Sequence, residues 1–363
     1  MSALSGGIFD TTRAEDDTAE LRALVDELGR RSFEARLGQR GMPEKFDDDL
    51  WRTLEETGLA RLTSTPDLGA GPVESAVVLY GVARHAGAVP IAETDLLAAW
   101  LGQQADIELP SGPLTVAIAD IDAAEGRVHG VATAVPWLRA CAATLLVVCT
   151  GNEVRIGILY PNDAQVQKGL RPGHNLAGEP RDHLAFDVAA DQLHPVDPAV
   201  AAELTRRGAW ARCVQIIGAL DAAAALSVDH SRQRIQFGRP LSKFQAVQHS
   251  LAAMAGDIER ARAATTLAIA AAAEHGFDSA QTDFAVTVAK VTVGRVADAV
   301  TTIAHQLHGA IGVTAEHPLW LATMRAQSWA TDYGSPAHYA RRLGRLALAA
   351  PEPWDVLIGN ATP

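Results

Sequence analysis

Long helical faces of apolar residues dominate the chain after Pro198, and they restrict the fold more than any other feature of the sequence. In two of these faces the apolar residues recur at alternating spacings of three and four, and they are Phe244, Val247, Leu251, Met254 and Ile258, then Val293, Val296, Val300, Ile303 and Leu307. This spacing puts the apolar side chains on one side of a helix and is typical of packed antiparallel helices. A further face is formed by Ile217, Leu220, Ala224 and Val228, and a last helix is predicted over about 318–349, interrupted at 334–336. We therefore expect a C-terminal bundle of four long helices.

The residues before Pro198 show different patterns, first of shorter helices and then of strands. Amphipathic helices are predicted around 21–28, over 46–60 and over 73–87. The turn-rich stretch 66–72 is interpreted as an ordinary loop, and a phosphate cradle is the alternative. Between 110 and 195 the chain has four short β-branched runs bounded by turn-forming residues, TVAIADI, ATLLVVCTG, EVRIGILY and LAFDVAA, while 162–181 fit no element. We predict a helical domain over 1–108, a reduced β-rich domain over 109–196 and the bundle over 197–363, which together make a mainly α fold with a small β domain.

Composition and charge exclude several classes of function. Lys and Arg number 31 against 43 Asp and Glu, which gives a net charge of −12 and a pI near 5.4, so we expect no binding to nucleic acid. Hydrophobic residues make up 48% but aromatic residues only 5%, as in an alanine-rich helical protein. The first residues do not resemble a signal peptide and no long apolar run is present, so we expect a cytoplasmic protein without a membrane span. The spacing of Cys141, Cys149 and Cys213 predicts neither a disulfide framework nor a metal site.

A polar segment around 231–245 joins two of the predicted bundle helices. Arg234 offers a planar fork of donors suited to a phosphate, Gln236 adds an amide, and Phe237 adds an apolar surface. Gly238 and Pro240 turn the chain. An arginine at a helix end is also commonly just solvated, so the residues alone leave both interpretations open.

A second segment, Gln306-Leu-His308-Gly309-Ala310-Ile-Gly312, ends the next helix. Its glycines allow close approach of the backbone to a ligand, although a simple helix cap and loop would have the same composition. It lacks the preceding strand and the following helix of a dinucleotide-binding fingerprint, which is therefore rejected.

Together, RxQFGxPLxxFQ from Arg234 to Gln245 and QxHGxxG from Gln306 to Gly312 resemble the acyl-CoA dehydrogenase family. FDDDLW and ATAVPWLRACAATLLVV resemble its first and middle domains more weakly. The resemblance implies an N-terminal helical domain, a middle β domain and a C-terminal four-helix bundle, FAD as cofactor, and an electron-transfer flavoprotein or similar electron acceptor. It also implies a tetramer in which the bundle of one subunit completes the FAD site of its neighbour.

Carried over residue by residue, the resemblance assigns nine positions to FAD binding. It puts Arg234 and Gln236 at the pyrophosphate, Phe237, Phe244 and Gln245 beside it, and Gln306, His308, Gly309 and Ala310 at the adenosine end.

The family's reaction also needs a carboxylate base, and here the sequence departs from the pattern. In many relatives a Glu follows a structural Arg by nine positions, but counting from Arg325 gives Gly334. The alternative family position falls near Gly208. Asp332 is the remaining candidate base, two positions away and one methylene shorter, and its other interpretation is a solvated acidic side chain. Arg206, Arg207 and Arg212 are interpreted as an exposed basic helix face, and Trp210 and Trp329 as packing residues.

The middle segment also lacks the family's flavin-binding motifs of the Thr-Glu-Pro-Gly, Gly-Ser-Asp and Trp-Ile-Thr types. The chain thus resembles the base-lacking subunit of bacterial α2β2 heterotetrameric acyl-CoA dehydrogenases, which act on CoA thioesters of bulky acids such as sterol side-chain fragments. The first hypothesis is a subunit that donates half of an FAD site to a homologous partner carrying the catalytic Glu. The alternatives are a self-sufficient homotetramer with an unusual carboxylate base and a non-catalytic scaffold.

Overall fold

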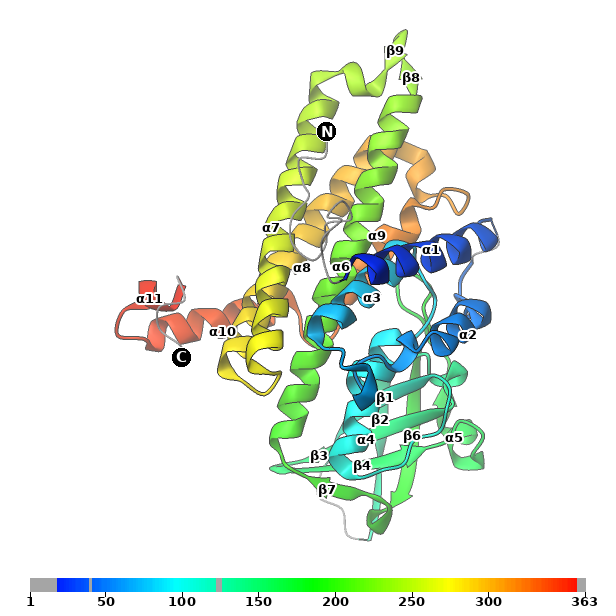
Figure 1. Cartoon of the computed structure of the whole chain (residues 1–363), viewed down its shortest axis with the longest axis vertical. Helices are drawn as coiled ribbons and strands as arrows, with labels where there is room; N and C mark the ends of the chain where they lie inside the picture. Colours follow the sequence, from blue (N-terminus) through cyan, green and yellow to red (C-terminus); the bar gives the residue numbers. More distant parts are fainter. Residues whose placement is uncertain (1–17, 39–40, 122–125, 358–363) are drawn as a thin grey trace. The chain divides into compact units, whose positions relative to one another are not determined.

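The computed structural model describes residues 18–38, 41–121 and 126–357 (Figure 1). The N-terminal residues 1–17, for which no signal peptide was predicted, lie outside the described residues. The chain divides into two compact units, which we describe separately. The first unit comprises the described residues within Met1–Gln39, Gly71–Gly87 and Ala209–Pro363, and the second those within Arg40–Ala70 and Ala88–Gly208.

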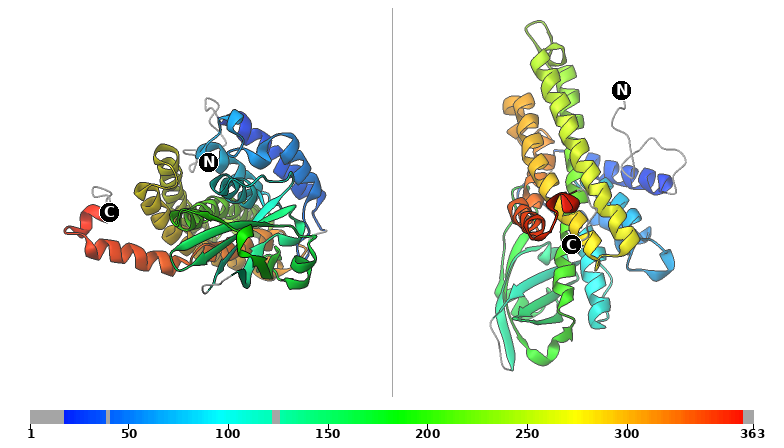
Figure 2. Two further views of the ribbon diagram at one scale, coloured as in Figure 1. Left: turned by 90° about the horizontal axis from the view of Figure 1, so that it is seen from below. Right: turned by 90° about the vertical axis from the view of Figure 1, so that its left-hand side faces the viewer.

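The first unit is built from helices. It contains α1 (Ala19–Ala35), α3 (Pro72–Arg84), most of α6 (Ala199–Gln233), α7 (Gln245–His275), α8 (Ala280–His308), α9 (Leu319–Thr331), α10 (Pro336–Ala349) and α11 (Pro353–Leu357). α7 packs along α8, which also packs on α9 and α10, and α1 packs on α3. Figure 2 shows α6 and α7 as two long neighbouring helices joined at one end by a hairpin. The bundle expected from the apolar faces is therefore present.

The predicted seam of this bundle is buried only along part of its length. Met254, Ile258, Val293, Val296 and Val300 are all at most 2% exposed. The same faces become partly exposed toward the hairpin end of α7 and the C-terminal end of α8, at Val247, Leu251, Ile303 and Leu307. The apolar periodicity thus continues past the part of the seam that the described residues cover.

The last predicted helix is interrupted as expected. α9 ends at Thr331, Gly334 has a φ of 109°, and the Ser335 side chain accepts a hydrogen bond from the His338 N–H at the start of α10. Pro336 occupies the first turn of α10, where its missing N–H leaves no hydrogen bond unmade.

The second unit contains the strands. A four-stranded sheet has the order β1 (Leu114–Asp120), β3 (Ala143–Thr150), β4 (Glu153–Leu159), β7 (His194–Val196), in which only β1 and β3 run parallel. A three-stranded antiparallel sheet has the order β2 (Arg127–Pro136), β6 (Arg181–Ala189), β5 (Leu170–Arg171). One apolar core joins the two sheets and includes Ala117, Ala132, Leu146, Leu159 and Leu184.

Short helical elements complete this unit. They are α2 (Asp48–Glu56), η2 (Leu59–Arg61), η3 (Pro66–Leu68), a π-helix η4 (Glu93–Ala99) that continues into α4 (Trp100–Ala105), η5 (Leu138–Ala140), α5 (Ala164–Gly169) and η6 (Ala190–Gln192). α5 and β5 occupy the 162–181 stretch for which no element was predicted. β2 and β7 were not predicted from the sequence either.

Among the described residues, α6 is the one helix long and apolar enough to cross a membrane by length and composition. Of its most apolar window, 67% is buried inside the structure, as in the core helix of a folded domain.

Candidate functional site

The segment between α6 and α7 is a short β-hairpin with a strained tip. β8 (Ile235–Gln236) pairs with β9 (Arg239–Pro240), and the two residues between them, Phe237 and Gly238, have φ values of 52° and 77°. Positive φ at both central residues is the requirement of a type I′ turn. Glycine adopts it freely, whereas phenylalanine does so at a cost. The Phe237 side chain is 91% exposed.

The predicted pyrophosphate contacts gather around this tip. The Phe237 and Phe244 rings are 6.1 Å apart, and the Arg239 guanidinium lies 4.2 Å from the centre of the Phe244 ring. The backbone of Arg234 is fixed by hydrogen bonds to His230 and Leu241. Among the described residues no group bonds its exposed guanidinium, which is therefore available to an anion.

The predicted adenosine-end residues divide into two groups. Gln306, Gly309 and Ala310 are exposed at the C-terminal end of α8, and Gln306 lines an open groove of about 630 Å³ together with Thr301, His305 and Gln327 from α8 and α9. Gly309 has a φ of 63° and nothing within 4 Å of where a Cβ would stand, so its backbone is open to a ligand.

His308 does not share this surface. Its side chain is 5% exposed, and its ring stacks on that of His230 with 4.5 Å between the centroids. His230 lies four residues before Arg234, so this contact brings the end of α6 next to the end of α8. The structure thus places the two sequence motifs side by side, although the His308 ring itself points inward.

Asp332, the candidate base, is held in an ion pair. Its Oδ2 accepts a hydrogen bond of 2.9 Å from Nε of Arg212, and the two side chains are 25% and 3% exposed. The interpretation of Arg212 as part of an exposed basic face was wrong, because its guanidinium is buried and also donates to Gln215. Earlier on the same helix, Arg207 is bonded to Glu203.

The tryptophans have the packing role that was predicted. Trp210 is fully buried, donates to the Ala268 carbonyl and packs edge-on against Phe277, and Trp329 is 3% exposed. All three cysteines are free thiols. Burial raises the pKa of each of them, for Cys213 to about 12, so their reactive thiolate forms are disfavoured.

Comparisons with known proteins agree with these motifs. Residues 199–335 match the family described as acyl-CoA dehydrogenase, C-terminal domain. The acyl-CoA dehydrogenase FadE27 of Mycobacterium tuberculosis is 26% identical to this chain over 94% of its length and 99% of the relative.

Solved structures share the fold of the whole chain. A chain of the ChsE4–ChsE5 complex from M. tuberculosis superposes with a TM-score of 0.78 and 23% identity, covering 94% of this chain and all of that one. A chain of a variant Tcur3481–Tcur3483 steroid ACAD gives a TM-score of 0.76 and 22% identity, over 91% and 98% of the two chains. The mainly α fold with a small β region is therefore the acyl-CoA dehydrogenase fold.

Proposed function

We propose that the chain is a member of the acyl-CoA dehydrogenase family, whose members are FAD-dependent flavoproteins, and that it is one subunit of a heteromeric enzyme. The complex introduces a double bond between the α and β carbons of a CoA thioester. This chain supplies half of an FAD site, and a homologous subunit supplies the rest of the site and the catalytic Glu.

The observation that carries the proposal is the exposed tip of the α6–α7 hairpin. Phe237 is 91% exposed, in a backbone conformation that phenylalanine rarely adopts, beside an arginine that no described residue bonds. An aromatic ring that projects from an uncommon backbone conformation and a guanidinium without a protein partner are both suited to contact a ligand or a second chain. An exposed ring and an arginine without a protein partner are expected where one subunit contributes residues to a site in its neighbour.

The donors at this surface fit the charged part of FAD. The Arg234 guanidinium and the exposed side-chain amides of Gln236 and Gln306 can bond a diphosphate, and the open backbone at Gly309 allows close approach. Phe244 and Gln245 extend the same surface at the start of α7. When bound, FAD accepts the hydride from the substrate. The residues of this chain bind and orient its diphosphate and adenosine ends.

The absence of a suitable carboxylate supports a partner that brings the base. Glycine occupies both positions, 334 and 208, where the family resemblance places a Glu. Asp332 is the nearest acidic residue, and one of its oxygens is bonded to a buried arginine. Since a general base must reach the proton it removes, this carboxylate is better suited to holding α6 and α9 together.

The proposal also covers the substrate, the electron acceptor, the compartment and the assembly of the complex. We assign a bulky, sterol-derived acyl-CoA as substrate, a role in steroid degradation, an electron-transfer flavoprotein or similar acceptor, and a cytoplasmic α2β2 assembly. In support, two of the structurally similar proteins are two-component complexes, and one of them is named as a steroid enzyme.

The test compares the purified chain alone with the chain co-expressed with its genomic neighbour of the same family. We expect the flavin absorbance and the dehydrogenation of a steroid-derived acyl-CoA only in the complex. Arg234→Ala should reduce flavin occupancy of the complex, whereas Arg232→Ala, which removes an exposed arginine from the last turn of α6, should not. Full flavin occupancy and turnover by the isolated chain would refute the proposal, and a colourless complex would favour a scaffold.

A further inference from the structure

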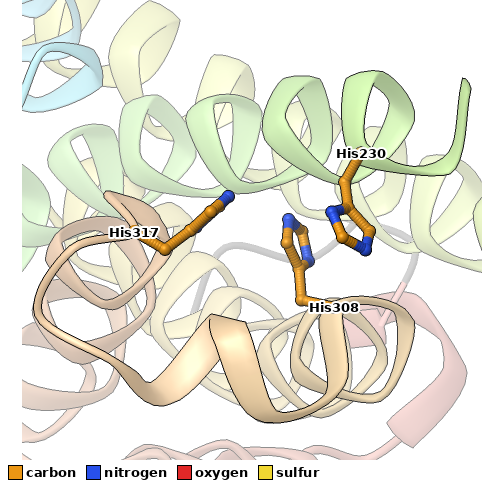
Figure 3. A group of neighbouring side chains, drawn as sticks. All are labelled: His230, His308 and His317. Carbon is orange, nitrogen blue, oxygen red and sulfur yellow. The ribbon is translucent and has the colours of Figure 1, made fainter. Parts of the chain in front are cut away.

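Three histidines meet at the end of α6, the end of α8 and the segment just before α9. His230 lies in the last turn of α6, His308 is the last residue of α8, and His317 lies two residues before α9 begins. One ring nitrogen of each lies within 4.8 Å of those of the other two. Figure 3 shows the rings pointing toward one another from three separate stretches of backbone.

The ring of His308 is oriented by the protein. Its Nδ1 lies 2.8 Å from the Ala304 carbonyl oxygen, and because a carbonyl only accepts, Nδ1 carries the ring hydrogen. The lone pair is then on Nε2, which is buried and has no hydrogen-bond partner among the described residues. Metal-binding histidines are typically fixed in this way, with one nitrogen donating to a carbonyl and the other free for the ion.

Burial also favours the neutral state that metal binding needs. It lowers the pKa of all three imidazoles, and the charges of neighbouring histidines lower those of His230 and His317 further. Arg234 acts in the same direction on His230. The carbonyls of Ala304 and Leu226 oppose the shift at His308 without reversing it. Metal ions bind the neutral form of imidazole.

We propose that His230, His308 and His317 form a binding site for a divalent transition-metal ion of the Zn²⁺ type. Neutral imidazole nitrogens suit zinc, cobalt, nickel and copper, whereas magnesium and calcium prefer oxygen ligands. Three histidines leave the fourth position of a tetrahedral ion open to water or another ligand. Such an ion would tie the ends of α6 and α8 to the start of α9. No metal site was predicted from the sequence, and the histidine cluster departs from that prediction.

Binding requires an adjustment of His317. Its Nδ1 accepts a 3.1 Å hydrogen bond from the Leu319 N–H, so in the metal-free chain its hydrogen is on Nε2. Coordination through Nε2 moves that hydrogen to Nδ1 and breaks the bond to Leu319. Bonds of about 2.0–2.1 Å to one tetrahedral ion bring nitrogens to roughly 3.3 Å from each other. His317 is half-buried and lies outside the helices, so its side chain is the one that can close this distance.

The experiment titrates the isolated full chain, freed of any histidine tag and stripped with EDTA, with ZnCl₂ in a calorimeter and with CoCl₂ in a spectrophotometer. We expect one high-affinity equivalent of Zn²⁺, a higher Tm with the metal, and the visible absorption of tetrahedral Co²⁺. His317→Ala and His230→Ala should each weaken binding at least about tenfold. His249→Ala, which removes an exposed histidine from α7, should bind as the parent does.

Two results would overturn the assignment: no saturable binding by the stripped chain, or binding that is equal in the parent and in both cluster variants. Circular dichroism identifies any variant that fails to fold, and His317→Gln then replaces His317→Ala. Because no flavin, substrate or partner is present, failure here leaves the proposed subunit function untouched, and failure of that function leaves the metal titration valid.

Discussion

Nε of Arg212, on α6, lies 2.9 Å from Oδ2 of Asp332 at the end of α9, and the arginine side chain is only 3% exposed. The same guanidinium lies 5.8 Å from the ring centres of Trp329 and Tyr333. A buried guanidinium needs a counter-charge, because an unpaired charge in the interior is strongly unfavourable. The pair therefore gives Asp332 a clear structural task at the place where the sequence suggested a base.

The Asp332→Asn variant distinguishes a structural role of this carboxylate, as counter-charge to Arg212, from a role as catalytic base. We expect the free energy of unfolding to fall by about 2 kcal/mol, since the amide oxygen can still accept from Arg212 but carries no charge. Turnover of the complex with its partner should change only a few-fold. If Asp332 were the base, the substitution would instead lower turnover by about 10²–10⁴-fold. Urea unfolding and steady-state kinetics decide between them, with Glu352→Gln, an exposed carboxylate of the same unit, as the control.

A second buried network joins three helices of the first unit. The Tyr80 hydroxyl on α3 donates to Asp221 on α6 at 2.6 Å, and Arg262 on α7 donates to both oxygens of Asp221 at 2.8 and 3.0 Å. Tyr80→Phe should cost about 1.5–3 kcal/mol for a lost bond to a charged group. Arg262→Met should cost about 3–5 kcal/mol, because it leaves the carboxylate without its cation. Urea unfolding of both variants should give this order, and the reverse order would contradict it.

Two helical glycines offer a matched pair of opposite effects. A Cβ on Gly294 of α8 would stand 2.2 Å from Cγ of Pro336, so Gly294→Ala should destabilise the fold by about 1–3 kcal/mol through overpacking. Gly256 of α7 is exposed with nothing within 4 Å of its Cβ position. There Gly256→Ala should stabilise by about 0.5–1 kcal/mol through helix propensity. In thermal unfolding, the Tm should fall for Gly294→Ala and rise for Gly256→Ala.

The sequence predicted what depends on local patterns. The spacing of Val293, Val296 and Val300 was enough to indicate the bundle, because a helix repeats every 3.6 residues wherever it packs. β2 was missed, since Gly130 and its alanines carry little strand preference and its place depends on pairing with β6. The His230–His308–His317 cluster was also missed, because His230 is distant in the chain from the other two and only the packing of α6 against the end of α8 brings it to them.

For the site residues too, local patterns were predictable from the sequence and features that depend on tertiary packing were not. The motifs located Arg234, Gln236 and Gln306 on exposed surfaces that can reach a ligand. They gave no indication that the His308 ring points inward, because a helix C-terminus exposes some positions and buries others according to its neighbours. Arg212 was misassigned because an arginine on a helix is usually exposed, and its buried partner Asp332 lies far along the chain.

The buried Lys290 on α8 predicts a pH dependence of stability. Its Nζ donates to the carbonyls of Ala330 and Asp332 at 3.0 and 2.8 Å, and the residue is 1% exposed. Burial lowers its pKa below the usual value, while the charges of Cys213 and Asp332 oppose this shift. Between the lowered pKa and the ordinary value of about 10.4, the unfolded chain binds more protons than the folded one. The stability contributed by this group therefore rises with pH in that range.

The measurement is the free energy of unfolding from pH 7 to pH 10.5 for the parent chain and for Lys290→Met. The parent should gain stability relative to the variant as the pH rises, because the cost of burying the ammonium disappears when it loses its proton. Other groups titrate in this range, and the difference between the two curves removes their common contribution. Lys168→Met, which removes an exposed lysine of α5, should give a curve parallel to the parent. A constant difference for Lys290→Met would mean that this lysine has the same pKa in both states.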